Sequence, residues 1–124
     1  MRTAVVSYKL LQDGQVPESA DVRQGNLDLL ILKALSLEPM HGWGISQRLQ
    51  QLSDDVLQIP QGSLYPALQR LERRGLVAAT WEQSDNNRRA RYYRLTADGR
   101  KQLATERTEW LRYVNAVHLI LQAR

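Results

Sequence analysis

The sequence contains no cysteine and only two histidines, His41 and His118, which are far apart in the chain. The lack of cysteine excludes disulfide bonds and thiolate metal sites, and it fits a reducing cytoplasm. Neither histidine has a companion at a spacing typical of metal ligands, so we expect both to be structural. No Ser-His-Asp arrangement, carboxylate pair or glycine-rich loop after a strand suggests a catalytic site. The sequence therefore predicts no metal, no cofactor and no enzyme.

Long apolar runs are also missing. None approaches the roughly 18 consecutive apolar residues that a membrane-spanning helix needs. The first residues, "MRTAVVSYKLL", lack the long apolar segment and the small-residue cleavage site of a secretory signal. With 124 residues, of which 43% are hydrophobic, the chain is long enough for one domain with a core. We expect a cytoplasmic protein in which residues 1–24 form a flexible extension.

Positive charge is concentrated in one part of the chain. The net charge is +4, but residues 1–69 carry 5 basic and 7 acidic side chains, whereas residues 70–112 carry 11 basic and 6 acidic ones. The stretch "NNRRARYYR" contains four arginines and no acid. Such a local excess of arginine is expected of a protein that binds a polyanion. A solvated basic loop is the alternative.

A helical pattern begins at residue 26. Asn26 is a good N-cap residue. The apolar residues that follow repeat at the spacing of a helix face: Leu27, Leu30, Ile31, Ala34 and Leu35. Leu29 and Leu32 lie off this face, so the helix is apolar almost all round, and a small domain cannot cover every side of it. We therefore expect Leu29 and Leu32 to contact a second subunit.

A second helix is predicted over residues 44–52, after the stretch "EPMHGWG", which is rich in helix breakers. Its apolar side chains, Ile45, Leu49 and Leu52, fall on one face. We expect all three to point into the core.

A third helix is predicted to begin at Ser63 and to end at Gly75, a typical C-terminal residue. With Ser63 as the N-cap, Pro66 falls in the first turn, where its missing N–H costs little. The buried stripe consists of Leu64, Leu68 and Leu71. The outward face carries polar and basic side chains that are suited to contact DNA: Gln61, Ser63, Tyr65, Gln69, Arg70 and Arg73.

A β-hairpin and a long helix complete the chain. Two runs of β-branched and aromatic residues flank the turn-rich stretch "SDNNRRA", which predicts a hairpin with an arginine-bearing tip. The arginines of the tip are Arg88, Arg89 and Arg91. Thr96 then caps a helix that runs to about Gln122. Its apolar residues follow the spacing of a short coiled-coil seam: Leu103, Trp110, Val114, Val117 and Leu121.

Three helices followed by a basic hairpin predict a winged helix-turn-helix. In this fold the third helix enters the major groove of DNA, and the hairpin lies along phosphates or in a minor groove. The expected fold class is mostly helical with a small β-hairpin. Residues 25–95 form the DNA-binding winged helix-turn-helix domain, and residues 96–124 form a C-terminal dimerisation helix. From pattern alone, an undirected basic domain of mixed helices and strands is the alternative.

Four segments resemble the PadR family of bacterial transcriptional regulators: "HGWGI", "GSLYPALQRLE", "GLV" and "RRARYYRLTADG". The resemblance covers about residues 25–121. Trp43 occupies a position that is usually tyrosine in the family. The single C-terminal helix is similar to the short-tailed subgroup, so nothing is carried over from members with a large C-terminal effector domain.

The resemblance implies roles for several residues. Ser63 and Tyr65 match the recognition helix of the family and would face DNA. Arg88, Arg89 and Arg91 match its wing and would contact phosphates. The C-terminal helix resembles the family's dimerisation helix.

The resemblance also implies how such a protein is regulated. Trp110 lies where several members place an aromatic residue that lines a pore between the subunits, which would make it a ligand-binding residue. Packing as ordinary dimer core is the alternative for this tryptophan. Members are typically homodimeric repressors, and some are released from DNA by small, often aromatic, compounds.

Some of the DNA-facing residues have structural alternatives of their own. Tyr65 would also serve to cap a groove against a loop of the same chain. Arg70 and Arg73 have the alternative of pairing with Glu72 or Glu106 on a solvated face.

Taken together, the residues and the resemblance predict a homodimeric repressor that binds an inverted-repeat operator in double-stranded DNA and is released by a small aromatic ligand. A non-sequence-specific nucleic-acid-binding protein is one alternative, and a small-molecule-binding dimer with a minor DNA role is another. The outward polar set of Gln61, Ser63, Tyr65 and Gln69 argues against the first alternative, because phosphate contacts alone do not need it. The arginine-bearing hairpin argues against the second.

Overall fold

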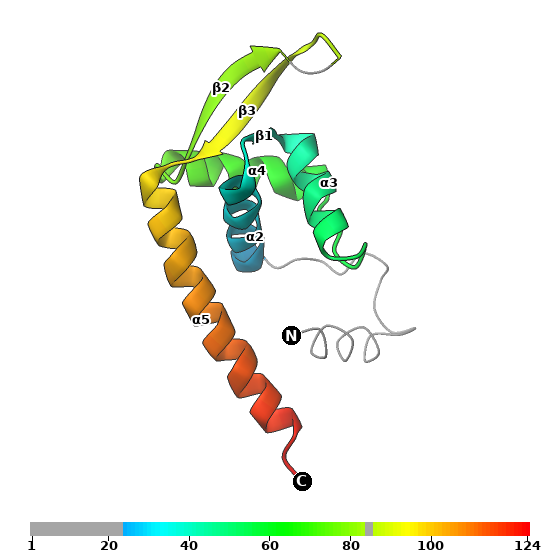
Figure 1. Ribbon diagram of the computed structural model, residues 1–124, viewed down its shortest axis with the longest axis vertical. Helices are drawn as coiled ribbons and strands as arrows, with labels where there is room; N and C mark the ends of the chain where they lie inside the picture. The colour runs from blue at the N-terminus through cyan, green and yellow to red at the C-terminus, as the bar shows by residue number, and fades with distance from the viewer. Residues whose placement is uncertain (1–23, 84–85) are drawn as a thin grey trace.

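The computed structural model describes residues 24–83 and 86–124, and the predicted helices and hairpin follow one another in the predicted order. The helices are α2 (Gln24–Leu37), α3 (Gly42–Leu52), α4 (Gln61–Arg73) and α5 (Ala97–Leu121), and the strands are β1 (Met40–His41), β2 (Val77–Gln83) and β3 (Arg89–Leu95). Figure 1 shows three short helices packed together, with the β2–β3 hairpin projecting on one side and α5 leaving on the other. This is a winged helix-turn-helix with a C-terminal helix. The predicted extension, residues 1–24, lies outside the described residues except for Gln24, where α2 begins.

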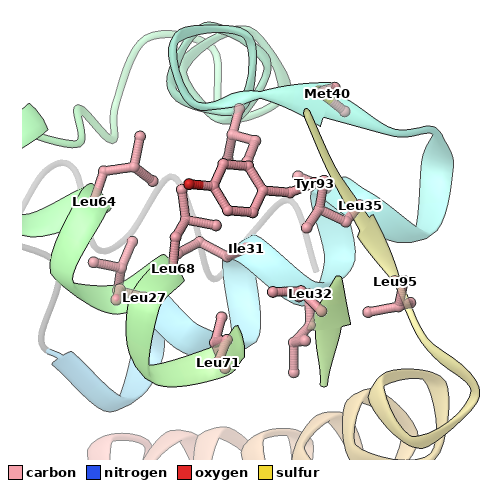
Figure 2. Close-up of a cluster of buried hydrophobic side chains, with 14 of the residues drawn as sticks. Leu27, Ile31, Leu32, Leu35, Met40, Leu64, Leu68, Leu71, Tyr93 and Leu95 are labelled. Atoms are coloured by element: carbon pink, nitrogen blue, oxygen red, sulfur yellow. The ribbon is translucent and has the colours of Figure 1, made fainter. Parts of the chain in front are cut away.

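Helix α2 is central to the core, and it contacts α3, α4, α5 and β3. In Figure 2, Leu27, Ile31, Leu32 and Leu35 of α2 point into the cluster that also holds the leucines of α4. The prediction that Leu32 faces a second subunit is wrong, because the chain's own elements bury this side chain completely. Leu29 is half-buried. The predicted N-cap was also wrong, since α2 begins two residues before Asn26.

Helix α3 begins at Gly42, earlier than predicted, because His41 caps it. The His41 Nδ1 atom accepts a hydrogen bond of 3.0 Å from the Gly44 N–H. Ile45 and Leu49 are buried as predicted. Leu52 is 55% exposed, contrary to the prediction, because it is the last residue of the helix and lies beyond the core.

Helix α4 begins two residues earlier than predicted, at Gln61, with Pro60 as the N-cap. Ser63 is not the cap; its N–H donates to the Pro60 carbonyl oxygen at 3.0 Å. Pro66 therefore lies in the second turn, where it has no N–H to offer the Gly62 carbonyl. This turn lies at the exposed end of the helix, where water can bond that oxygen instead.

The body and the C-terminal end of α4 match the prediction. Leu64, Leu68 and Leu71 are fully buried. After the helix ends, Gly75 adopts a φ of +75°, in the left-handed region that favours glycine. Its N–H donates to the Glu72 carbonyl at 2.9 Å, and the Leu76 N–H donates to the Leu71 carbonyl at 3.0 Å. These two bonds make a Schellman motif, which turns the chain from α4 directly into β2.

Strands β2 and β3 form the predicted hairpin, and the two-residue strand β1 adds to β3, giving the sheet order β1-β3-β2. Strand β1 was not predicted, because two residues carry no readable alternation. The β2–β3 pairs run from Val77 opposite Leu95 to Gln83 opposite Arg89. Opposite residues point to the same face of a sheet, and every second residue shares that face. The face that is buried at Val77 therefore continues toward the end of the hairpin, beyond the core.

Helix α5 begins at its predicted cap, where the Gly99 N–H donates to Thr96 Oγ1 at 3.0 Å. Gly99 stands at the position where a capping box would have glutamate. A Cβ atom at this position would collide with the Leu76 carbonyl oxygen, which explains the glycine. Leu103 packs against the core, and the rest of the helix extends away from the body of the protein (Figure 1). No helix in the described part of the chain is long and apolar enough to cross a membrane.

Candidate nucleic-acid interface

The first candidate surface is the N-terminal end of α4. Gln61, Ser63, Tyr65 and Gln69 are all exposed, as their spacing predicted. Gln61 is partly engaged, since its Nε2 donates to Ser46 Oγ of α3 at 3.0 Å. One amide N–H and the amide oxygen of Gln61 remain available for another partner.

Tyr65 is held against the start of α3. It is 43% exposed. Its ring lies so close to Gly42 that a Cβ atom there would come within 2.6 Å of the phenol oxygen. The Tyr65 ring therefore packs directly against the backbone of Gly42, and a larger residue at position 42 would displace the ring. The sequence signal for this contact was the glycine pair around Trp43, but the partner of the glycine was not predictable from local spacing.

A shallow groove of about 450 Å³ adjoins this end of α4. It lies between α3 and the segment that leads into α4, and Gln61 forms part of its edge. Its other polar side chains are Ser46, Gln47, Gln50 and Gln58. Trp43, which is largely exposed, forms an aromatic wall. The surface beside the recognition helix is thus rich in amide groups that both donate and accept hydrogen bonds.

The basic residues of α4 differ in their surroundings. Arg70 forms an ion pair of 3.1 Å with Asp28 of α2, a partner that was not considered from the sequence. This pair compensates the charge of Arg70. Arg73 is exposed.

The wing arginines are not loose tip residues. Strand β3 begins at Arg89, two residues earlier than the predicted run, so Arg89 and Arg91 lie on the strand itself. Arg91 forms an ion pair of 2.7 Å with Glu72 of α4. The guanidinium carbon of Arg89 lies 5.6 Å from the centre of the Trp81 ring. Arg89 and Arg91 therefore both have partners within the chain, and Arg88 is exposed beside them.

Tyr93 connects the wing to the core. It is buried, and Figure 2 shows its ring among the side chains of α2 and α4. Burial raises the pKa of its hydroxyl above the ordinary value of 10.0, and the nearby charge of Arg91 acts in the opposite direction. Tyr93 therefore stays protonated at neutral pH and anchors the base of the hairpin.

The second candidate surface is the far half of α5. Along the predicted seam, Val114 and Val117 are half-buried and Leu121 is exposed. Trp110 is 39% exposed, and its ring centre lies 5.9 Å from that of Tyr113. Exposed Tyr113 and Ile120 flank the seam and widen this surface, and Leu111 and Leu119 are exposed elsewhere on the helix. Tyr113 and Ile120 are seven residues apart and lie next to seam residues, and this spacing was the sequence signal that they share the face of the seam.

This apolar surface has no cover among residues 24–83 and 86–124. Gly99 and Leu103, in the first turns of α5, are the residues through which this helix meets the described core. An exposed apolar surface of this size marks a site of interaction with another molecule.

Comparisons with known proteins agree with this geometry. The model of the PadR-like family of transcriptional regulators matches residues 31–105, more than half of the chain. The solved structure of a transcriptional regulator from Clostridium thermocellum is 27% identical, covers 83% of this chain and 100% of its own, and has a TM-score of 0.74.

Two further solved structures are similar. A PadR-like transcriptional regulator from Bacillus cereus is 28% identical over 82% of this chain and 96% of its own, with a TM-score of 0.70. A PadR family regulator from Eggerthella lenta is 28% identical over 99% of this chain and 97% of its own, with a TM-score of 0.69. The chain therefore belongs to the PadR-like family and is a DNA-binding transcriptional regulator with a winged-helix fold.

Proposed function

We propose that the protein is a cytoplasmic homodimeric repressor that binds an inverted-repeat operator in double-stranded DNA. The observation that carries this proposal is the exposed polar N-terminal end of α4 together with a wing that bears four arginines. The N-terminal end of a helix presents the positive end of the helix dipole, which favours contact with phosphate. The absence of cysteine fits the cytoplasm, where operator DNA of a bacterium lies.

Base contacts are assigned to Gln61, Ser63, Tyr65 and Gln69. Amide and hydroxyl groups both donate and accept, so they can match the pattern of donors and acceptors that each base pair shows in the major groove. Arg73 adds a positive charge on the same helix. Each good base contact contributes about 1–3 kcal/mol of discrimination against a wrong base.

The remaining arginines divide into two groups. We assign Arg88, Arg89 and Arg91 to the DNA backbone or the adjacent minor groove, and the ion pair with Glu72 limits the contact that Arg91 makes with DNA. Arg70 is bound to Asp28. We therefore assign Arg70 to the positioning of α4 against α2 rather than to a direct DNA contact.

The dimer is assigned to the uncovered surface of α5. Leu103 meets the core, and the same stripe of apolar residues continues along α5 through Trp110, Val114, Val117 and Leu121. A second copy of the helix would cover this stripe. Dimerisation by this helix would leave both copies of α4 free. Two recognition helices that read half-sites on one face of DNA lie about 34 Å apart, one turn of the double helix.

Release by a small aromatic ligand is assigned to Trp110. Paired tryptophans at a helix junction are too large to pack without some separation of the helices, and the resulting space suits a flat apolar molecule. Such a ligand would weaken DNA binding only if it binds the DNA-free arrangement of the dimer more tightly than the DNA-bound one.

The test is selection of duplexes from a random library by the purified protein. We expect an inverted repeat whose half-sites are centred about 10 base pairs apart, because two recognition helices would each occupy one half-site. Footprinting of the DNA upstream of the gene would then show whether the protein controls its own promoter. Selection of no common sequence, with binding to all duplexes alike, would support the non-specific nucleic-acid-binding alternative instead.

A further inference from the structure

Trp81 and Arg89 form a pair on the inner face of the wing. Trp81 is 59% exposed, and the guanidinium carbon of Arg89 lies 5.6 Å from the centre of its ring. This distance is typical of a cation–π interaction. Trp81 lies opposite Arg91, and Arg89 follows diagonally on the same face. At the base of the hairpin this same face of the sheet is buried against the core. Trp81 and Arg89 lie further along it, where the wing extends beyond the core.

Neighbouring contacts fix the backbone that carries this pair. Gln83 Nε2 donates to Asn87 Oδ1 at 2.6 Å, which ties the residues before β3 to the end of β2. Asn87 adopts a φ of +63°, a conformation that asparagine tolerates better than most residues. Arg91 is held separately, by its ion pair with Glu72. Arg89 is therefore the wing arginine whose orientation depends on an aromatic ring.

We propose that Trp81 is a positioning residue that holds Arg89 for insertion into the minor groove beside each half-site, and that the pair makes binding sensitive to the width of that groove. The inference rests on the proposed function and goes beyond it by naming what the wing reads. An arginine that makes only phosphate contacts needs no fixed orientation and carries no sequence information. An arginine in a minor groove needs a fixed orientation and carries sequence information. A narrow groove has a stronger negative potential that attracts the guanidinium group, and the width of the groove depends on the sequence.

The chemistry of the pair suits this role. A cation–π contact uses the charge of the guanidinium group and none of its N–H groups as donors to a protein acceptor, so these N–H groups can reach acceptors on base edges and sugars. The ring restricts the rotamers of Arg89 before DNA arrives, so less side-chain entropy is lost on binding. Arg94 provides a matched control, because it is an exposed arginine of the same strand that points to the opposite face.

The experiment uses the full chain and three duplexes with the selected inverted repeat in common. The base pairs just outside the half-sites are A·T tracts in one duplex, G·C pairs in the second, and inosine·cytosine pairs in the third. Inosine lacks the minor-groove amino group of guanine, so inosine·cytosine resembles A·T in the minor groove and G·C in the major groove. We expect the wild-type protein to bind the A·T and inosine duplexes more tightly than the G·C duplex.

The variants then separate the ring from the bulk of the side chain. Trp81→Leu keeps apolar volume but lacks the ring quadrupole, so we expect it to lose about two- to fivefold in affinity for the A·T duplex and to lose the flank preference. Trp81→Phe should retain most of the preference. Arg89→Ala should abolish it without touching the ring, and Arg94→Ala should weaken binding to all three duplexes by the same factor.

A spectroscopic measurement tests the pair without DNA. In a Trp43→Phe, Trp110→Phe background, Trp81 is the only tryptophan, and Arg89→Ala should change its emission while Arg94→Ala should not. The inference is overturned if Trp81→Leu keeps the flank preference, or if the wild-type protein binds the three duplexes equally while still selecting the inverted repeat. Failure to select any sequence would instead overturn the proposed function.

Discussion

The guanidinium group of Arg91 lies 2.7 Å from the carboxylate of Glu72, and this ion pair joins the wing to helix α4. Both side chains are partly exposed, so the pair itself contributes at most about 1 kcal/mol to stability. Its larger consequence is electrostatic. Glu72 places a negative charge between α4 and the wing, the two elements that are assigned to DNA binding. It also binds Arg91, which would otherwise be available to contact the phosphates.

Glu72→Gln should therefore tighten binding to every duplex. The change removes one negative charge and releases Arg91 for a phosphate contact, which should steepen the salt dependence of log K by roughly one unit. Affinity measured at several salt concentrations checks this. Glu82→Gln is the control, since this exposed acid bonds Thr80 on the outer face of the hairpin. An unchanged slope for Glu72→Gln would mean that Arg91 does not reach DNA.

Gly42→Ala should disturb DNA recognition through Tyr65. The added methyl group would meet the Tyr65 ring, so the ring must move away from its place on the surface of α4. We expect Tyr65→Ala to cost about 1–3 kcal/mol of specific binding, the range of a groove contact. Gly42→Ala should lose nearly as much specific binding as Tyr65→Ala. The double variant Gly42→Ala, Tyr65→Ala should bind no more weakly than Tyr65→Ala alone. Additive losses would show that Gly42 acts by another route.

The glycine at the start of α5 should be far less tolerant of substitution than the glycine in α4. Gly99→Ala forces a methyl group into the Leu76 carbonyl, and overpacking of this kind costs about 1–3 kcal/mol. Gly62→Ala meets nothing within 4 Å and should stabilise the protein by about 0.5–1 kcal/mol, because alanine favours the helix. Urea denaturation at one protein concentration measures both. Equal stability of the two variants would contradict the close approach of α5 to Leu76.

The sequence predicted most of the fold where the signal was local. Leu64, Leu68 and Leu71 repeat at helical spacing, and a glycine follows at Gly75; both features stand in the structure as predicted. The hairpin was also predictable from alternation. The starts of the helices were less so, because His41 caps α3 through its ring and Pro60 precedes α4 without a side-chain cap.

Features that depend on distant residues were not predictable. Leu32 looked like spare apolar surface because helix α2 packs against elements far away in the chain, such as α4 and α5. The partner of Arg91 on α4 is 19 residues away, and the contact requires the hairpin to fold back over that helix. Local spacing shows which way a side chain points, whereas its partner is set by the tertiary fold.

Val117→Glu should break the dimer. A carboxylate buried between two copies of α5 has no partner and loses its hydration. Asn115→Glu is the control, because this residue is polar and exposed and lies off the predicted seam. Sedimentation at micromolar concentration should show a dimer for the wild-type protein and for Asn115→Glu, and a monomer for Val117→Glu. A wild-type monomer under these conditions would contradict the assignment of α5.

Trp110 should report a bound ligand if it lines the junction between the subunits. In a Trp43→Phe, Trp81→Phe background its emission is isolated. We expect planar aromatic compounds to quench it and, at the same concentrations, to weaken operator binding by the dimer. If emission is blue-shifted but unquenched by a panel of such compounds, Trp110 is ordinary dimer core.

Sequence-specific recognition of duplex DNA is the central claim, and a salt titration tests it most directly. Affinity for the selected inverted repeat and for a random duplex is measured from low to physiological salt. Both affinities should fall with salt, because both depend on phosphate contacts, but their ratio should stay at about a thousandfold or more. A ratio that stays near one at every salt concentration would show that binding is purely electrostatic, and would contradict the account.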